Sequence, residues 1–426
     1  MRSTHAGRWT RRGFVAAMAG PWIVPSRALG LGGQLPASER IALGFIGLGW
    51  KGFTGCWGSL LQGFIADPTC RVRAVCDVDR VYRQRAKAFV DETYHDRGCA
   101  SYRDFRDLVV RSDLDAVVIA TPDHWHAVQT IWACRHGKDV YCEKPLSLTI
   151  REARAMVQAA RRHGRIVQAG SQSRSMGRLR SACEIVQSGR IGKVVEVRVG
   201  CGGPAVPCPL PAERQPEGLD WDLWLGPAPW RPFHSQIHPV AFRAWSDYSG
   251  GGMTDWGAHH FDLAQWGLGK DHAGPVEIIP PDGREHRWLT YTYADGVRIA
   301  HSSFDIGAGV TFVGSEGKVW AMGVAAETRF EPASLGRLRL RPEELTVTQN
   351  TGNQSHTRNF LECVRTRRLP NADVEIACRT AILCHLGNIA YQLQRPLQWD
   401  PQREVFVGDE EANRFLDRAR REPWDI

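Results

Sequence analysis

The sequence predicts an α/β protein, with an N-terminal doubly wound parallel sheet and a C-terminal α+β domain built on an open mixed or antiparallel sheet. Short apolar segments alternate with helical ones between residues 41 and 169, as parallel strand–helix units require. After about residue 171, strand-like segments follow one another without intervening helices, which favours antiparallel pairing. The length agrees with this prediction, because 426 residues allow two domains of ordinary size.

The N-terminal domain is expected to hold five strands. Residues 114–120 form an almost continuous apolar run, which indicates a strand buried on both faces of a parallel sheet. The other expected strands are 41–47, 71–76, 139–142 and 165–169, and helices are expected up to about residue 64 and over 80–92, 102–111, 124–136 and 149–163.

The C-terminal domain is expected to begin with a helix at 178–188 and a strand at 193–199. Pro, Gly and Trp crowd residues 200–252, which predicts an ordered loop. Turn signals such as Asp295-Gly296 separate further strands, and two helices close the chain. These strands are expected at 287–293, at 297–304 and from 319 onward, and the helices at 356–367 and 374–393.

The composition is typical of a globular protein with a full core, at 43% hydrophobic and 23% charged residues. No uninterrupted apolar stretch reaches about 18 residues, so no membrane span is expected. The formal charge of +8 falls to +3 without residues 1–30, which hold five arginines and no acid. Because no dense Lys/Arg run with interleaved aromatics remains, a nucleic-acid partner is not expected.

The first thirty residues have the pattern of an export signal. Residues 10–15 contain the twin arginines Arg11 and Arg12, a weakly apolar run follows at 16–24, and small residues lie near Ala28. This order predicts a removable signal recognised by the twin-arginine export machinery, and hence a periplasmic or extracytoplasmic protein. A disordered basic tail is the alternative. The expected divisions are the signal at 1–30, a nucleotide-binding domain at 40–170, and a substrate-binding and assembly domain at 171–426.

The twelve cysteines lie between Cys56 and Cys384 and show no C-x-x-C pair or zinc-ligand spacing. Many lie in apolar segments, where a free cysteine behaves as a small hydrophobic residue. Buried thiols are expected, although an exported protein could also form one or two disulfides.

A glycine-rich turn, Gly47-Leu48-Gly49-Trp50-Lys51-Gly52, lies between the first expected strand and the helix after it. In this setting the first glycine allows a tight turn, the second lets the backbone approach a diphosphate, and the third lets helix and strand pack closely. The phosphates then meet the positive end of the helix. We therefore predict a dinucleotide site at residues 47–52, with a glycine turn that binds no ligand as the alternative.

Asp77 follows the second expected strand, where a carboxylate can hold both hydroxyls of a ribose. A carboxylate repels a 2′-phosphate, so the sequence predicts NAD in preference to NADP. Arg80 could weaken that preference.

Oxidation of an alcohol requires a base near the hydroxyl, because the proton leaves as the hydride does. Asp255 and His259 have the i, i+4 spacing that places two residues on one helix face, so the carboxylate could orient the imidazole or relay a proton with it. Lys144 follows a parallel strand at its carboxyl end, where such sheets bind ligands, and its charge can stabilise a developing alkoxide. A structural role for His259 and a metal site formed with His238 are the alternatives, although no tight ligand spacing supports a metal.

The chain resembles the Gfo/Idh/MocA oxidoreductases, which include glucose–fructose oxidoreductase and inositol dehydrogenase, over essentially its whole mature length. Its Glu-Lys-Pro tripeptide is the most specific landmark. The landmarks are residues 47–52, 120–126 (Ala-Thr-Pro-Asp-His-Trp-His), 143–145 (Glu-Lys-Pro) and 255–262 (Asp-Trp-Gly-Ala-His-His-Phe-Asp).

The resemblance implies that Lys144, Asp255 and His259 are catalytic and that the second domain assembles homodimers or homotetramers. It also implies a set of residues that line the cofactor. These are Thr121, Pro122, His126 and Gln172, and Glu143 is expected to touch the nicotinamide ribose in preference to acting as an acid. His260, next to His259, is expected to point outward or to lie behind the residues that contact substrate, and a direct contact with substrate is the alternative.

The segment from Asp220 to Trp245 is rich in Trp, His and Arg. Aromatic faces suit sugar rings, and Arg243 and His238 could bond their hydroxyls. The alternative is a loop held by its own tryptophans, or a subunit contact.

The favoured function is reversible oxidation of a secondary hydroxyl on a sugar, glycoside or polyol with NAD. A second hypothesis is a glycosidase that keeps NAD bound and oxidises its substrate transiently, so that the aglycone can be eliminated, as some members of the family do. A third is a nucleotide-binding protein without catalysis, which the presence of Lys144, Asp255 and His259 disfavours. Export favours a tightly bound cofactor, because free NAD is not recycled outside the cytoplasm and this route carries folded proteins.

Overall fold

The computed structural model describes residues 35–54, 59–302, 309–322, 327–341 and 355–426. Residues up to Arg40 form a unit of their own, in which a 3-10 turn spans Ala37–Glu39 and the Arg40 guanidinium donates to the carbonyl oxygen of Leu35. All other elements belong to a compact unit that begins at Ile41. Residues 1–30, where the export signal is expected, lie outside the described residues.

The first sheet has six strands, all parallel, in the order β3-β2-β1-β4-β5-β6. This confirms the predicted doubly wound sheet. The order reverses between β1 and β4, which opens a crevice at the carboxyl ends of the strands. The strands are β1 (Ile41–Ile46), β2 (Cys70–Cys76), β3 (Ala100–Tyr102), β4 (Ala116–Ile119), β5 (Asp139–Cys142) and β6 (Val167–Ala169).

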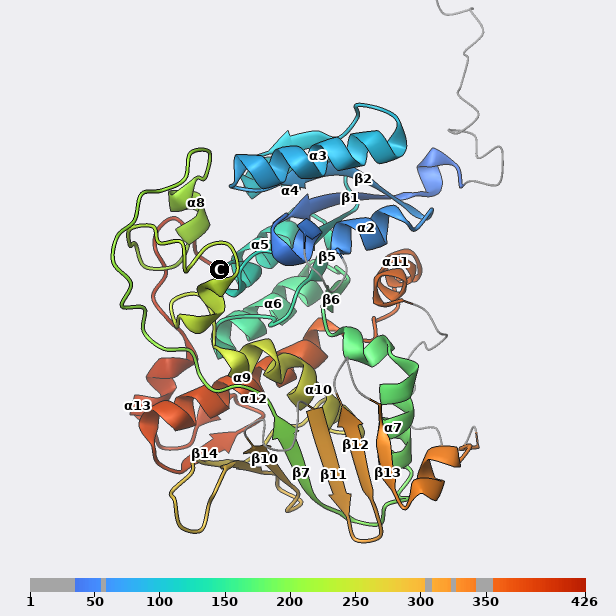
Figure 1. Ribbon diagram of the computed structural model, residues 1–426, viewed down its shortest axis with the longest axis vertical. Helices are drawn as coiled ribbons and strands as arrows, with labels where there is room; N and C mark the ends of the chain where they lie inside the picture. The colour runs from blue at the N-terminus through green and yellow to red at the C-terminus, as the bar shows by residue number, and fades with distance from the viewer. Residues whose placement is uncertain (1–34, 55–58, 303–308, 323–326, 342–354) are drawn as a thin grey trace, which may run out of the picture. The chain divides into compact units, whose positions relative to one another are not determined.

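Helices cover both faces of this sheet (Figure 1). Alternate residues of β4 point to opposite faces, so Val117 and Ile119 join one apolar cluster and Ala116 and Val118 the other. The first cluster includes residues of α4 (Phe105–Val109), α5 (Asp123–Arg135) and α6 (Ile150–Arg162), and the second those of α2 (Leu60–Ile65), α3 (Arg80–Tyr94) and α11 (His356–Thr366). The single helix expected at 102–111 is instead the strand β3 followed by α4.

The second sheet has nine strands in the order β13-β12-β11-β7-β10-β9-β8-β14-β15. β7 and β10 are parallel and the other neighbouring pairs are antiparallel, so the sheet is mixed, as predicted. The strands are β7 (Val194–Gly200), β8 (Glu277–Ile279), β9 (Leu289–Thr292), β10 (Arg298–Ser302), β11 (Gly309–Gly314), β12 (Lys318–Met322), β13 (Arg329–Glu331), β14 (Leu397–Asp400) and β15 (Val405–Phe406).

The C-terminal domain also contains α7 (Gly177–Gln187), α9 (Gly252–Asp255), α10 (Gly257–Gly267), α12 (Val374–Leu393) and α13 (Glu410–Asn413). All residues of α10 are buried, and it packs against both α12 and the sheet. None of the helices in the described ranges has the length and apolar character needed to cross a membrane.

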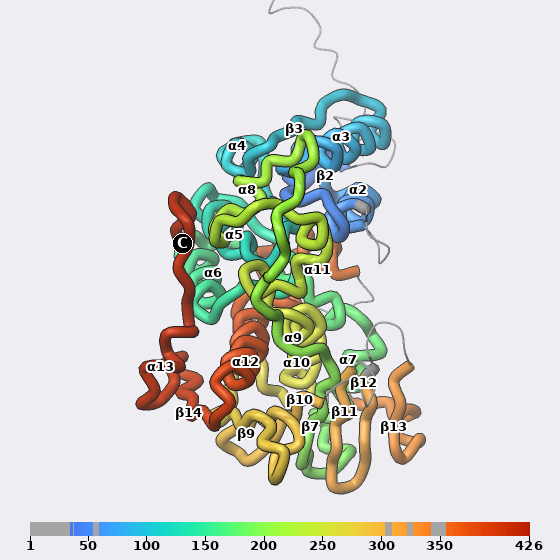
Figure 2. The backbone as a smooth tube through the Cα atoms, turned by 60° about the vertical axis from the view of Figure 1, so that its left-hand side comes forward, coloured from blue at the N-terminus to red at the C-terminus, as the bar shows by residue number. Residues whose placement is uncertain are grey.

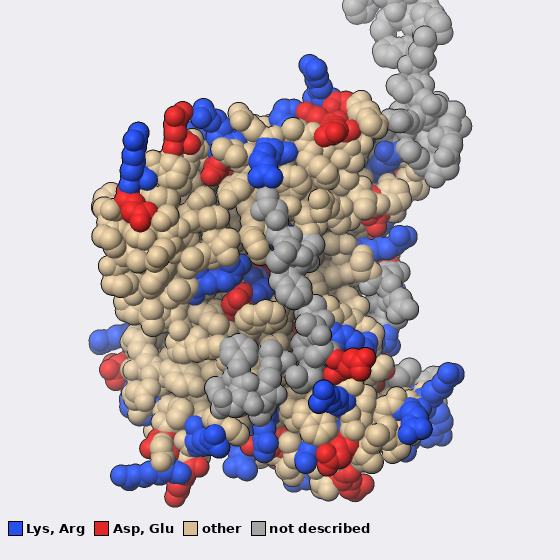
Figure 3. Space-filling model, in the orientation of Figure 1, with Lys and Arg blue, Asp and Glu red and all other residues tan. Residues whose placement is uncertain are grey.

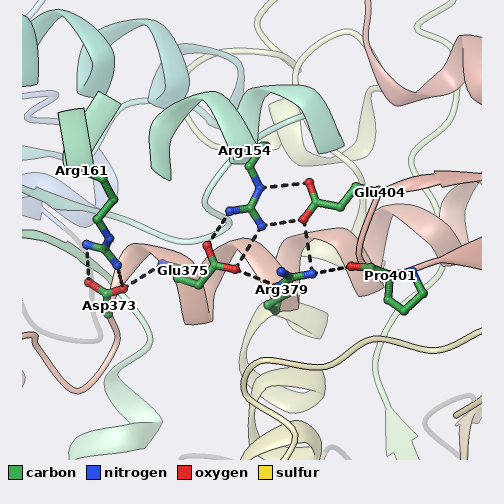
Figure 4. A network of polar contacts seen from close by, with 7 residues as sticks. All are labelled: Arg154, Arg161, Asp373, Glu375, Arg379, Pro401 and Glu404. Carbon is green, nitrogen blue, oxygen red and sulfur yellow. Dashed lines mark hydrogen bonds and ion pairs between the residues drawn. The ribbon is translucent and has the colours of Figure 1, made fainter. Parts of the chain in front are cut away.

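A network of arginines and acids connects α6 to α12 (Figure 4). Arg154 of α6 lies 2.5 Å from Glu375 of α12 and 2.5 Å from Glu404, which follows β14, and Arg379 bonds both acids. Arg161 pairs with Asp373 at the start of α12. These contacts fix the two domains to each other.

Residues 201–251, named here the bridging segment, leave the C-terminal domain after β7 and return to it at α9. Both views show the segment extending alongside the helices of the N-terminal sheet, with α8 (Trp221–Leu225) near its far end (Figures 1 and 2). It has an apolar cluster of its own, which includes Trp221, Trp224 and Phe233. The prediction of an ordered loop over residues 200–252 is therefore confirmed, and this loop also contains the short helix α8.

Candidate active site

A cavity of about 440 Å³ lies where the carboxyl ends of the parallel strands meet the bridging segment and helices α9 and α10. Its lining includes Gly47 after β1, Asp77 after β2, Thr121 after β4 and Lys144 after β5. This is the edge at which doubly wound sheets bind ligands. In Figure 3 acidic and basic side chains are intermixed on the face drawn, and a small group of both lies near its middle.

The three glycines of the turn differ in the space around them. Gly47 has a φ of +86°, and a β-carbon there would lie 2.7 Å from the Thr121 nitrogen, so only glycine fits. A β-carbon on Gly52 would collide with the carbonyl oxygen of Gly47. At Gly49 a β-carbon would meet nothing within 4 Å, and the residue lines the cavity. These are the turn, the close packing and the open approach that a dinucleotide diphosphate requires.

The helix expected directly after this turn is interrupted. A single wide turn spans Trp50–Thr54, and α2 begins only at Leu60, with residues 55–58 outside the described part of the chain. Trp50 and Lys51 line the cavity, whereas Leu48 is fully buried beneath it.

Asp77 lines the cavity at the end of β2. Its Oδ2 accepts the Leu48 N–H at 2.6 Å, and its Oδ1 accepts the Asp79 N–H at 2.8 Å. Burial raises the pKa of Asp77 to about 6, although these two donors act to lower it. Arg80 lies 3.2 Å from Glu217 and is not among the cavity-lining residues, so its charge is directed elsewhere.

Lys144 and Asp255 form an ion pair in the wall of the cavity. The Lys144 Nζ lies 2.5 Å from Asp255 Oδ1 and 2.8 Å from its carbonyl oxygen. The Arg243 Nε lies 3.3 Å from the same Oδ1. Burial acts to raise the pKa of Asp255, but the charges of Lys144 and Arg243 outweigh it and hold the pKa below its usual value. Asp255 is therefore a carboxylate that holds two cations.

His259 lines the cavity from α10, and only 8% of the residue is exposed. Its Nδ1 is buried and has no hydrogen-bond partner among the described residues. Burial, together with the charge of Lys144, lowers the pKa of His259 well below its usual value. The neutral form of the ring is therefore favoured, and its buried Nδ1 is not engaged by another described residue.

The predicted pairing of Asp255 with His259 is wrong. α9 ends at Asp255 and α10 begins at Gly257, so the two residues do not share one continuous helix. The carboxylate bonds Lys144 and Arg243 instead of the imidazole. The Trp256 ring lies beside Lys144 and His259, with its centroid 5.9 Å from Lys144 Nζ and 6.2 Å from the centroid of the His259 ring.

Glu143 and Gln172 line the cavity together. The Gln172 Nε2 donates to Glu143 Oε1 at 2.8 Å and lies 3.1 Å from the Tyr141 hydroxyl. The Lys144 N–H donates to Glu143 Oε2 at 3.1 Å. The carboxylate is thus held in place beside Lys144, with each oxygen accepting one of these hydrogen bonds.

Thr121 and Pro122 also line the cavity, but His126 is not among the lining residues. The His126 Nδ1 lies 2.7 Å from the Pro145 carbonyl oxygen, and its Nε2 lies 2.9 Å from that of Thr121. The ring therefore connects the loops that follow β4 and β5. Its place is behind the cavity wall, where it positions Thr121.

Besides Lys144, three residues were candidates to touch substrate. Arg243 and His238 line the cavity, and His260 does not. The His260 Nδ1 lies 2.6 Å from the Gly200 carbonyl oxygen, and the residue is buried. His260 therefore connects α10 to β7 and does not face a ligand.

Sequence reasoning missed several residues of the cavity wall. Tyr82 and Arg103 lie near Asp77, and Trp224, Phe242 and Trp256 contribute aromatic surface. The crowding of tryptophans at 220–245 was the sequence feature that pointed to this aromatic surface. The alternative, a loop held by its own tryptophans, is also correct, because Trp224 stacks on Trp221 with ring centroids 4.6 Å apart. Tyr82 and Arg103 had no distinguishing pattern.

Within the described ranges, no group of three or more His, Cys, Asp or Glu side chains is arranged to hold a metal ion. The eleven cysteines that the structure describes there are free thiols, and all but Cys208 are buried.

Curated relatives share parts of the chain. It is 32% identical over 130 residues to a glycosyl hydrolase family 109 protein of Shewanella sp. (strain W3-18-1), which is 30% of this chain and 27% of that protein. It is 40% identical over 93 residues to 1,5-anhydro-D-fructose reductase of Ensifer adhaerens, or 22% of this chain and 28% of the relative. The matches therefore span only about a quarter of either relative.

Solved structures share the fold over most of the chain. The aldose-aldose oxidoreductase of Caulobacter crescentus, crystallised with glycerol, superposes with a TM-score of 0.59 at 20% identity, covering 84% of this chain and 99% of that one. The myo-inositol 2-dehydrogenase of Lactobacillus plantarum superposes with a TM-score of 0.56 at 18% identity, with the same coverage.

Two family descriptions match consecutive parts of the sequence. Residues 42–171 match the oxidoreductase family with an NAD-binding Rossmann fold, and residues 207–426 match the C-terminal alpha/beta domain of the same family. The first range contains the glycine turn and Lys144, and the second contains Arg243, Asp255 and His259. The chain belongs to the Gfo/Idh/MocA family of oxidoreductases.

Proposed function

We propose that the protein oxidises a secondary hydroxyl of a sugar, glycoside or polyol with NAD as hydride acceptor. One observation carries the proposal: Lys144, Asp255 and His259 meet in the same cavity as the glycine turn. Bound NAD would supply the hydride-accepting ring. The neutral His259 would take the hydroxyl proton, and the charge of Lys144 would stabilise the oxygen as the carbonyl forms.

The cofactor proposed is NAD and not NADP. The Asp77 carboxylate at the end of β2 would disfavour a 2′-phosphate. Arg80, the cation that could have offset it, is paired with Glu217. We further propose that the cofactor is bound tightly.

A glycosidase that retains NAD is the second candidate. The glycosyl hydrolase family 109 relatives favour it, at 32% identity over 130 residues. Such an enzyme would oxidise its substrate transiently and regain the hydride after the aglycone leaves. The same Lys144 and His259 would serve that reaction.

The experiment that separates these candidates uses the purified protein with its bound nucleotide. Sugars, polyols and aryl glycosides are added, and reduction of the nucleotide and release of the aglycone are followed together. Net reduction supports the dehydrogenase, and aglycone release without net reduction supports the glycosidase. A bound nucleotide with neither reaction would instead indicate a nucleotide-binding protein without catalysis.

Export and assembly are further parts of the proposal. The twin arginines at 11 and 12 support export with the cofactor already loaded. Replacing both by lysine should leave the protein in the cytoplasm, and unchanged periplasmic recovery would contradict export. The open nine-stranded sheet supports a homodimer or homotetramer, and a monomer by light scattering would contradict that.

A further inference from the structure

The bridging segment forms one wall of the cavity, beside the strand end that carries Asp77. Its residues Trp224, His238, Phe242 and Arg243 line the cavity. The His238 ring lies 6.1 Å from the ring of Tyr82, which belongs to α3 of the Rossmann domain and also lines the cavity. The segment therefore covers the part of the cavity where the ribose of an adenosine would meet Asp77.

The segment is anchored to the Rossmann domain at the end of β2. The Arg80 N–H donates to the Gly218 carbonyl oxygen at 2.9 Å, and the Asp220 N–H donates to the Val78 carbonyl oxygen at 3.1 Å. Asp220 also lies 3.3 Å from Arg103. Gly218 has a φ of +90°, so a larger residue there would strain the chain at this anchor.

A second anchor lies on α5. The Trp224 carbonyl oxygen accepts from Trp125 Nε1 at 2.9 Å and lies 3.0 Å from His124 Nε2. Gly226 packs so closely on the Trp125 ring that a β-carbon would collide with it, and its φ is +47°. The segment is therefore held at two places on the Rossmann domain, beside the end of β2 and on α5.

The interior of the segment makes it a packed element and not a loose loop. Leu219, Trp221, Trp224 and Tyr248 are each at most 5% exposed and belong to its own apolar cluster. The C-terminal tail also supports the segment, since Arg421 donates to the carbonyl oxygens of Gly226 and Pro227. Moving this element away from the cavity would therefore require its anchors to open.

We propose that residues 201–251 are a clamp that retains the adenosine half of the dinucleotide, and that the anchors at Gly218–Asp220 and Trp224–Gly226 set how fast the cofactor leaves. The family assignment supplies the ligand class, a nicotinamide dinucleotide. The clamp rests on the proposed nucleotide and not on the sugar. Nucleotide release can therefore be independent of the anchors while sugar oxidation proceeds, and the anchors can control release in a protein that oxidises no sugar.

The test measures nucleotide release, with NADH fluorescence as the probe and excess NAD as the displacing ligand. Gly218→Val and Gly226→Ala each weaken one anchor. Each should speed release about tenfold, the factor expected from losing one or two hydrogen bonds. The matched controls are Gly283→Val and Gly283→Ala, because Gly283 also has a positive φ of +69° but has open space around it and does not line the cavity. They should release NADH at the wild-type rate.

A second measurement covers the case in which an anchor variant does not fold. Hydrogen exchange of the Arg80 and Asp220 amides in the wild-type protein should slow when NADH is added, because opening linked to release is suppressed by bound ligand. Wild-type release rates in folded anchor variants would overturn the proposal. So would equal exchange of both amides with and without NADH.

Discussion

The Lys144 ammonium lies 2.5 Å from Oδ1 of Asp255, although 111 residues separate the two in the chain. Lys144 follows β5 of the Rossmann domain, and Asp255 ends α9 of the C-terminal domain. Because Arg243 contacts the same oxygen, one carboxylate holds two cations and the group keeps a net positive charge. That charge lies beside the neutral imidazole of His259, an arrangement suited to an oxygen that becomes negative as its proton leaves.

Replacing Lys144 with methionine should abolish oxidation while the nucleotide still binds. The substitution keeps the length of the side chain and removes the charge that stabilises the oxygen, so kcat should fall by about 100-fold or more. The measurement is steady-state oxidation together with nucleotide content. Lys193→Met is the control, because Lys193 is exposed and does not line the cavity. Near-normal turnover in Lys144→Met would contradict the assignment.

The acid limb of oxidation should lie below the ordinary histidine range. Burial and the charge of Lys144 lower the pKa of His259, so the base stays neutral as the pH falls through the usual value. The value of kcat/KM should therefore not halve at about pH 6.5, the usual histidine pKa, and should decline only at lower pH. A loss centred at the usual value, absent in His259→Gln, would show that His259 titrates normally.

The glycine turn offers a pair of variants with opposite effects. Gly49→Val should leave the melting temperature nearly unchanged and weaken NAD binding at least about tenfold, because a side chain there meets open cavity in the empty protein. Gly47→Ala should destabilise folding by roughly 1 kcal/mol or more, since the residue has a positive φ and contacts the backbone of Thr121. Thermal unfolding and nucleotide titration check both variants. Tight NAD binding by Gly49→Val would place the diphosphate elsewhere.

The preference for NAD should weaken in acid. Burial raises the pKa of Asp77 to about 6, so the carboxylate is charged at pH 8 and mostly protonated at about pH 5. Only the charged form repels a 2′-phosphate, so the ratio of the Kd for NADP to that for NAD should fall as the pH is lowered. The Asp77→Asn variant should give a smaller ratio that is insensitive to pH. A wild-type ratio that stays constant would exclude Asp77 as the discriminating charge.

The parallel sheet could be predicted because its signals are local. Five of its six strands are apolar or alternating runs, and the glycine turn and Asp77 follow two of them directly. The exception is β3, a partly exposed Ala-Ser-Tyr strand that meets the start of the helix expected at 102–111. The later strands gave weaker signals, since β8, β13 and β15 are three residues or fewer and owe their pairing to distant partners. The packing of α11 against the first sheet is likewise a long-range choice that the sequence does not encode locally.

The candidate site divides in the same way. Lys144, Asp255 and His259 were identified individually, and the cavity contains all three. The partners of these residues were not predicted correctly. The i, i+4 rule assumes one continuous helix, whereas the helix is interrupted at Trp256. Arg243 reaches Asp255 only because the bridging segment folds back toward α9, which depends on tertiary packing of its tryptophans.

A single-turnover measurement on the protein that carries its bound NAD tests the hydride transfer and the role of Lys144 most directly. A panel of sugars, glycosides and polyols is mixed with the wild-type protein and with Lys144→Met, and the nicotinamide absorbance is followed. At least one compound should reduce the bound cofactor in the wild-type protein and not in the variant. Equal reduction in both proteins, or none in either with every compound of the panel, would contradict this expectation.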